Sequence, residues 1–142
     1  MNIVRAVVER ALERDALDLA RQSAEVFRRF GDLTRYGSAR IAEAHQLFTR
    51  RDFAAAISVL EELQPILSGS SDLDTEMRLY VNLGYAYRQS GDIDRAMDAY
   101  QIAAGIVRAI GNVPEALRIE WNLASALTEV GRLVMPPGPV NP

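Results

Sequence analysis

The stretch SGDIDRAMDAY, residues 90–100, joins two apolar-patterned segments through a Gly–Asp pair followed by an apolar residue. Related joints return as GDL at 31–33, RDF at 51–53, SDL at 71–73 and GNV at 111–113. Asp and Asn accept hydrogen bonds from the first turn of a helix, and Gly can close the preceding helix. The polar residue recurs every 20 positions, which predicts joints between helices of about 16 residues. The predicted caps are Asp32, Asp52, Asp72, Asp92 and Asn112.

The segments between these joints carry apolar and small residues at helical spacing. In RLYVNLGYAYRQSG, residues 78–91, Leu79, Leu83 and Tyr87 share one face at steps of four, whereas a half-buried strand would alternate. We therefore predict an all-α fold of about six helices. The predicted helices are a first helix at about 3–30, two hairpins at 33–68 and 72–110, and a final helix at 113–130.

The last joint carries an additional helix-start pattern. Pro114 falls inside the first turn of the final helix, where proline is tolerated. Glu115 lies three residues after Asn112, and this spacing completes a capping-box pattern. The pattern predicts that the Glu115 side chain reaches back to the Asn112 backbone.

The composition limits the kinds of partner and site that this chain is expected to have. The chain has 142 residues, a formal charge of −3 and no cysteine, and all 16 basic residues are arginines. The lack of a basic block argues against nucleic acid as a partner, and the lack of cysteine excludes disulfides and thiolate metal sites. No segment reaches the ~20 apolar residues that span a bilayer, and the N-terminal stretch has no signal-peptide pattern. We expect a cytoplasmic protein with no membrane contact.

Successive helices differ, and the repeating unit is two helices, or 40 residues, long. A shift of 40 aligns YVNLGYAYRQSGD at 80–92 with EWNLASALTEVGR at 120–132. The opposite shift aligns RRDFAAAISVL at 50–60 with residues 90–100. The aligned pairs are Asn82 with Asn122, Leu83 with Leu123, Gly84 with Ala124, Ala56 with Ala96 and Leu60 with Tyr100.

One repeat has a pattern that can be assigned to a family. Its residues are Tyr80, Leu83, Gly84 and Tyr87 at spacings of three, one and three, followed by Ala96 and Tyr100. This resembles the tetratricopeptide repeat (TPR), with its large aromatic, Leu-Gly, Tyr, Ala and second aromatic. The 40-residue period is similar to the extended repeats of kinesin light chain and of bacterial peptide-sensing regulators. Their common run is matched by Gly111, Asn112, Glu115, Ala116, Arg118, Asn122 and Leu123.

The resemblance implies a right-handed superhelical array of antiparallel helix hairpins over residues 1–132, followed by a Pro-rich tail at 133–142. Small residues in this pattern let two helices approach closely, so Gly84 and Ala96 are expected where the central hairpin crosses. The other repeats depart from the pattern. Glu43-Ala44 replaces Leu-Gly in the first, and Glu120 takes the aromatic position in the last.

The resemblance also implies a concave groove lined by the first helix of each repeat. Such a groove binds an extended peptide or a partner protein. The positions that match the family's groove-lining positions are Arg78, Asn82, Tyr85, Arg88 and Gln89 in one repeat, Arg118, Trp121, Asn122, Ser125, Thr128 and Glu129 in the next, and Ala42, His45, Phe48 and Thr49 in the earlier one.

The repeated asparagine and arginine have a chemical rationale in such a groove. An Asn amide offers a donor and an acceptor, so Asn82 and Asn122 could pair with peptide backbone of any sequence. Arg78 and Arg118, one turn earlier on the same face, could each bind a carboxylate. Trp121 would supply an aromatic anchor. Two alternatives stay open: the asparagines are polar surface, and Trp121 packs beneath the tail.

The sequence offers little for catalysis. His45 is the only histidine, so a two-histidine metal site is excluded within one chain. Every Gly-Asp or Gly-Asn pair is explained by a helix joint, which leaves no phosphate-binding loop. Acidic neighbours such as Glu61 and Glu62 are expected at the solvated surface. We predict a protein that is not an enzyme and has no metal or cofactor.

The repeat array stops half-way through a repeat, so an apolar face is exposed at each end. Three explanations stay open. Leu133, Val134 and Met135 of the tail LVMPPGPVNP fold back over the last helix; the uncapped ends pair in a homodimer; or the chain is part of a longer array. The PPGP run also fits a polyproline ligand, although a disordered end is the simpler expectation.

We therefore expect a non-catalytic TPR-like adaptor that binds peptide or protein in its groove. The alternative is a ligand-sensing or oligomerisation module of a bacterial regulator whose effector domain lies outside this chain. A third hypothesis is a structural module that self-assembles through its ends.

Overall fold

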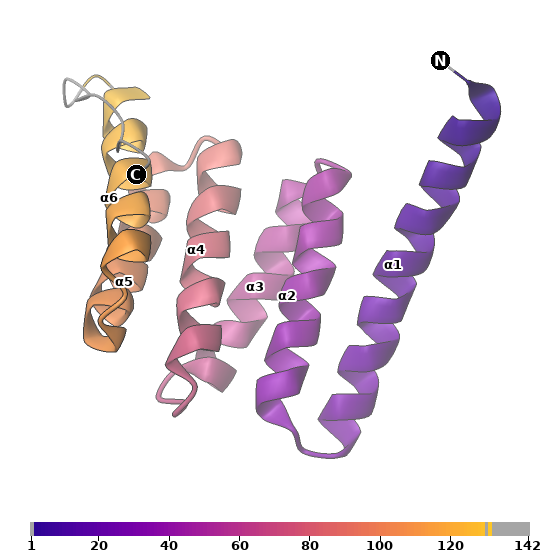
Figure 1. Ribbon diagram of the computed structural model, residues 1–142, viewed down its shortest axis with the longest axis horizontal. Helices are drawn as coiled ribbons and strands as arrows, with labels where there is room; N and C mark the ends of the chain where they lie inside the picture. The colour runs from indigo at the N-terminus through magenta and orange to yellow at the C-terminus, as the bar shows by residue number, and fades with distance from the viewer. Residues whose placement is uncertain (1, 130, 132–142) are drawn as a thin grey trace. The chain divides into compact units, whose positions relative to one another are not determined.

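The computed structural model describes residues 2–129 and 131, and these fold into helices joined by short turns (Figure 1). The elements are α1 (Ile3–Arg29), α2 (Leu33–Thr49), α3 (Phe53–Leu67), α4 (Leu73–Gln89), α5 (Ile93–Ile110) and α6 (Val113–Glu129). No strand occurs in this part of the chain. The predictions of an all-α fold and of six helices are confirmed, and the predicted helix ends agree with these bounds to within one residue.

The helices divide into two compact units. The first holds α1, α2 and α3, and the second holds α4, α5 and α6. In the first unit α2 packs against both α1 and α3, and in the second α5 packs against both α4 and α6. Within each unit consecutive helices are therefore partners, as hairpins require, while the right-handed superhelix stays a prediction. The tail at 133–142, with Leu133, Val134 and Met135, lies outside the described residues.

Each short joint closes one helix and opens the next with the same residue. In the joint after α4, Gly91 adopts a φ of 85° and donates its N–H to the Arg88 carbonyl. The Asp92 N–H donates to the Tyr87 carbonyl at 2.9 Å, which completes a Schellman motif. The Asp92 carboxylate accepts from the Arg95 N–H at 3.2 Å and caps α5. One residue thus satisfies free backbone groups of two helices.

The same pair of bonds recurs at the joints 30–32, 50–52 and 110–112. All five predicted caps accept from the backbone N–H three residues later: Asp32 from Arg35, Asp52 from Ala55, Asp72 from Thr75, Asp92 from Arg95 and Asn112 from Glu115. The joint before α4 is longer, and there the Asp72 N–H donates to the Ser70 hydroxyl at 3.1 Å.

The joint at 50–52 makes these bonds without glycine. Arg51 has a φ of 58° and is the non-glycine residue of the described chain with a positive φ. A side chain in this left-handed region costs about 1 kcal/mol relative to glycine. Its guanidinium lies 5.9 Å from the centre of the Phe53 ring. The joint at 50–52 therefore has the same geometry as the glycine joints, although the backbone of Arg51 is strained.

The predicted capping box is wrong. The Asn112 N–H donates to the Val107 carbonyl at 3.2 Å, in the Schellman motif that closes α5. The Glu115 carboxylate pairs instead with Arg118. The N–H that a capping box would use is already bonded to the preceding helix.

The close approach of α4 and α5 depends on Gly84. A Cβ built on Gly84 would lie 2.6–2.8 Å from three ring atoms of Tyr100. The Tyr100 side chain is only 2 % exposed and Leu83 is fully buried, so the ring has little room to move. The prediction that Gly84 lies in the hairpin interface is confirmed, and the group that fills the space beside it is the Tyr100 ring.

Candidate functional site

The predicted site residues fall on three helices. Arg78, Asn82, Tyr85, Arg88 and Gln89 lie on α4, and Arg118, Trp121, Asn122 and Ser125 lie on α6. These nine residues belong to the second unit. His45 lies on α2 of the first unit, where it is exposed and packs edge-on against Phe48 with the ring centroids 5.6 Å apart.

In the second unit the Arg88 side chain of α4 connects this helix to α6. The Arg88 Nε donates to Glu129 Oε1 at 3.0 Å, and its Nη2 donates to the Ser125 hydroxyl at 2.8 Å. The guanidinium also forms an ion pair with Glu129. The side chain of Arg88 is 21 % exposed and that of Glu129 is 49 % exposed. Arg88 of α4 therefore holds the end of α6 by two different groups.

The buried side chain of Tyr100 lies close enough to the Arg88–Glu129 pair for the two charges to affect its pKa. Burial raises the pKa of Tyr100, and Tyr85 and Glu129 raise it further while the charge of Arg88 opposes them. The hydrogen bond from Arg88 holds the pKa of Glu129 below its ordinary value. The α4–α6 link thus consists of an ionised carboxylate and a guanidinium beside a neutral tyrosine.

The two asparagines are not equivalent. Asn82 is 9 % exposed, and its Nδ2 donates to the Arg78 carbonyl of its own helix at 2.7 Å. Asn122 is half-buried at the corresponding place on α6. An Asn amide has two N–H donors and one oxygen acceptor, so this bond leaves Asn82 with less capacity for a ligand. Asn122 is therefore the more accessible of the two amides.

Several other predicted residues remain accessible. Tyr85 is 40 % exposed, and Gln89 is exposed at the end of α4. On α6, Trp121 is half-buried, and the Arg118 side chain is 74 % exposed and pairs with Glu115 at 3.3 Å. These side chains offer two aromatic rings, an amide and a cation on α4 and α6.

The described residues hold no group of three or more metal-ligating side chains. No helix in this part of the chain is both long and apolar enough to cross a membrane. Neither observation identifies a function.

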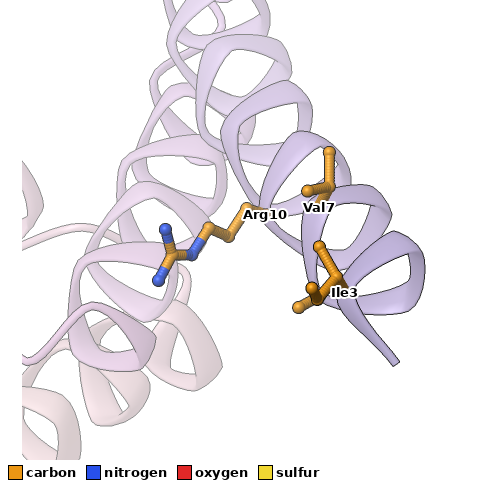
Figure 2. Close-up of a pocket in the computed structure, with 4 residues that line it drawn as sticks. Ile3, Val7 and Arg10 are labelled. Atoms are coloured by element: carbon orange, nitrogen blue, oxygen red, sulfur yellow. The ribbon is translucent and has the colours of Figure 1, made fainter. Parts of the chain in front are cut away.

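Shallow pockets occur away from the predicted site residues. One, of about 290 Å³, lies on the N-terminal half of α1 and is lined by Ile3, Ala6, Val7 and Arg10 (Figure 2). Another, of about 260 Å³, lies where α5 meets α6 and includes Val113 and Leu117 among its lining residues. Both linings are mainly apolar.

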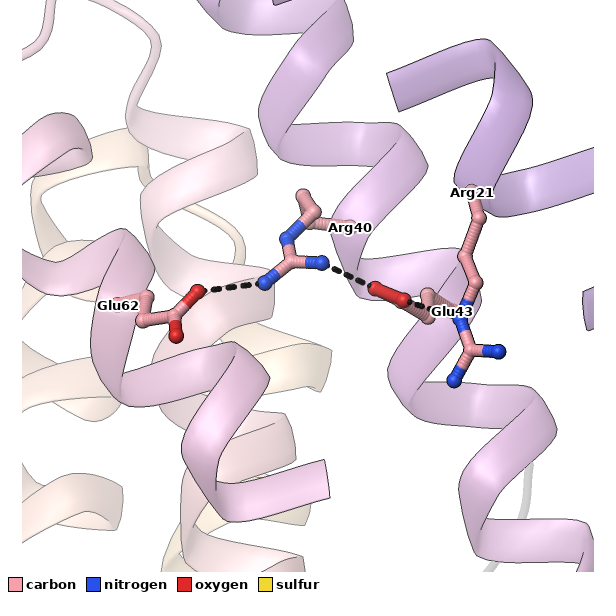
Figure 3. A network of polar contacts seen from close by, with 4 residues as sticks. All are labelled: Arg21, Arg40, Glu43 and Glu62. Carbon is pink, nitrogen blue, oxygen red and sulfur yellow. Dashed lines mark hydrogen bonds and ion pairs between the residues drawn. The ribbon is translucent and has the colours of Figure 1, made fainter. Parts of the chain in front are cut away.

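The first unit contains a polar network that sequence reasoning missed. The Glu43 carboxylate accepts from Arg21 of α1 at 2.9 Å and from Arg40 of α2 at 2.5 Å. Arg40 also donates to Glu62 of α3 at 2.6 Å, so the network spans all three helices (Figure 3). Glu43 is 3 % exposed. Glu43 stands at the Leu position of the repeat pattern and Arg40 at its aromatic position, and these two departures together are the signal for the network in the sequence.

No protein-family model matches the chain, and no curated protein matches it. The resemblance to the tetratricopeptide repeat therefore depends on the residues quoted from this sequence.

Proposed function

We propose that this protein is a non-catalytic cytoplasmic adaptor whose α4–α6 surface binds an extended peptide or a helix of a partner protein. The observation that carries the proposal is the bridge from Arg88 to Ser125 and Glu129. It joins two helices that are first helices of successive repeats. A surface held in this way is pre-organised, which lowers the entropy lost on binding.

The exposed groups around the bridge define what would be bound. The rings of Tyr85 and Trp121 offer apolar anchors, and aromatic residues of this kind dominate interface energies. The Asn122 amide can pair with both the N–H and the C=O of a peptide backbone. Arg118 adds a cation for an acidic side chain or a terminal carboxylate. We expect a peptide with an aromatic or aliphatic residue beside an acidic one.

An array of random peptides tests this proposal. The wild-type chain should select a related set of peptides, and the variants Trp121→Ala and Asn122→Ala should lose that selection. Gln101→Ala, on the exposed side of α5, is the matched control and should select as the wild type does. Equal selection by all four proteins, with unchanged helicity, would refute the site.

A second candidate is a ligand-sensing or oligomerisation module of a bacterial regulator. The exposed apolar residues of α1, which include Val4 and Leu12, favour it over an adaptor that works as a monomer. A DNA-binding segment encoded next to this chain in the same gene would support the regulator. The peptide array and a measurement of mass against concentration separate peptide binding from assembly.

A further inference from the structure

One face of α1 is uncovered in the described structure. Leu19 is 61 % exposed and Val26 is 48 % exposed, and Ser23 between them is also exposed. The three residues and their neighbours line a shallow pocket of about 280 Å³. This face lies on the opposite side of α1 from Leu17 and Ala24, which are buried.

The repeat register shows that two positions of this face, those of Leu19 and Ser23, are covered on α5. Residues 80 positions later are Ala99, which is 5 % exposed, and Ala103, which is fully buried. The next residue after Ala99, Tyr100, lies against Gly84 of α4. The equivalent of Ser23 on α3 is Leu63, which is also fully buried. Helices α3 and α5 each pack on the helix before them, and α1 has no such helix among the described residues.

Helix α6 also has a vacancy, that is, an apolar face that no helix of residues 2–129 covers. Val113 is 64 % exposed and Leu117 is 52 % exposed, and Ala124 and Leu127 on the same stripe are half-exposed. Forty positions earlier, the equivalents of Ala124 and Leu127 on α4 are Gly84 and Tyr87, both buried beside α5. In residues 2–129 no helix follows α6 to take that place.

We propose that a second copy of the chain fills both vacancies, so that α6 of one copy packs antiparallel on α1 of the next. The contact completes the missing hairpin, with α6 as its first helix and α1 as its second. The hairpins within the chain supply the template, because α2 packs on α3 and α4 packs on α5.

The side chains at equivalent positions are compatible with this contact. Gly84 lies against Tyr100 in the second unit, and the corresponding pair between copies is Ala124 and Ala20, which permits close approach of the helices. Arg40 of α2 pairs with Glu62 of α3, and the corresponding pair is Glu120 and Gln22. Glu120 Oε1 already accepts from Arg108 of its own chain, and the Gln22 amide can donate to the second carboxylate oxygen.

This interface joins two different faces, so it is heterologous. Each copy bound through its α1 still presents its α6, and growth stops only when a ring closes. Of the proposed peptide-binding residues, Asn122 lies on the other side of α6 from Ala124, whereas Trp121 lies one turn before Ala124. The variant Leu19→Arg, on α1, therefore removes assembly without altering the peptide-binding residues.

The test uses one variant for each face. Leu19→Arg changes the α1 face and Ala124→Arg changes the α6 face, and both introduce the same charge so that the altered faces cannot attract each other. Gln101→Arg, exposed on α5, is the matched control. Sedimentation analysis from low to high protein concentration should give a rising mass for the wild type and the control. Each face variant alone should stay at the 15.7 kDa of one chain.

The equimolar mixture of the two face variants decides between interfaces. Leu19→Arg retains an intact α6 and Ala124→Arg retains an intact α1, so the mixture should form one complex of two chains and stop there. A wild type that stays monomeric overturns the proposal. So does self-association of Ala124→Arg alone, which would mean that α1 pairs with α1. A monomeric full chain that assembles after removal of residues 133–142 would identify the tail as the occupant instead. Circular dichroism checks that each variant remains helical.

Discussion

Glu43 and Arg40, one helical turn apart on α2, form an ion pair at 2.5 Å in the interior of the first unit. The side chain of Glu43 is 3 % exposed and that of Arg40 is 17 % exposed. The Arg40 Nε is buried without a hydrogen-bond partner. The equivalent residues on α4 are Leu83 and Tyr80. The second unit therefore has an aliphatic and an aromatic side chain where the first unit has an ion pair.

The first prediction concerns this pair. Glu43→Leu should lower the free energy of unfolding by about 3 kcal/mol, because it leaves Arg40 with one partner fewer in a buried place. Adding Arg40→Tyr should recover most of the loss, since the double variant has the residues of α4. Urea unfolding measures both. The exposed pair Arg5 and Glu9 is the control, and Glu9→Leu should change the stability by less than about 0.5 kcal/mol. Equal stabilities for the single and double variants would contradict the prediction.

The second prediction concerns Gly84. Gly84→Ala should destabilise the protein, although Ala is favoured over Gly in a helix by about 1 kcal/mol, because the added Cβ meets the buried Tyr100 ring. Gly84→Leu should cost more. The first unit has Ala44 and Leu60 in the equivalent positions, so Gly84→Ala with Tyr100→Leu should be more stable than Gly84→Ala alone. Thermal unfolding measures the series, and a Gly84→Ala protein as stable as the wild type would show that the ring can move away.

The third prediction concerns the left-handed joint at Arg51. Arg51→Gly should stabilise the protein by about 0.5 kcal/mol, since it removes the strain of a side chain at a φ of 58° but loses the contact with the Phe53 ring. The reverse change at an equivalent joint, Gly91→Arg, should destabilise by about 1 kcal/mol. Chemical denaturation measures the two changes. A loss of stability in Arg51→Gly would mean that the contact with Phe53 outweighs the backbone strain.

The fourth prediction concerns pH. The pKa of Glu129 is held below its ordinary value of 4.5, chiefly by the hydrogen bond from Arg88. A lowered folded-state pKa contributes stability above the ordinary value, and that contribution disappears as the pH falls through the folded-state pKa. Glu129→Gln should therefore lower the melting temperature at pH 7 and have a smaller effect at pH 3. An equal decrease at both pH values would mean that the charge of Glu129 is not what matters.

The fifth prediction separates the two asparagines. Asn82→Ala should lower the stability by about 1 kcal/mol, because it removes the buried bond from Nδ2 to the Arg78 carbonyl. Asn122→Ala should leave the stability nearly unchanged and weaken peptide binding. Melting temperature and binding to a peptide selected from the array are measured on the same samples. A larger loss of binding in Asn82→Ala at unchanged stability would reverse the assignment.

The helix ends could be predicted from the sequence because their determinants are local. Asp92 bonds to Arg95 and Tyr87, which lie three and five residues away, so the joint is encoded in one short stretch. The site depends on distant partners. Arg88 and Glu129 are 41 residues apart, and Arg21 and Glu43 are 22 apart, and spacing alone does not show which charges meet. It also does not show that Asn82 turns its amide toward its own helix. Those properties follow from packing, which the repeat pattern describes only on average.

The dual use of one residue at each of the four short joints has a consequence for how such a chain can grow or shrink. Asp92 bonds both to the end of α4 and to the start of α5, so this joint contains no spare residue that could make room for an insertion. Adding one residue there would separate the two bonds, whereas adding or deleting a whole block from one joint to the corresponding joint would leave every cap intact. Duplication of gene segments at these joints is therefore the change in length that the backbone tolerates best.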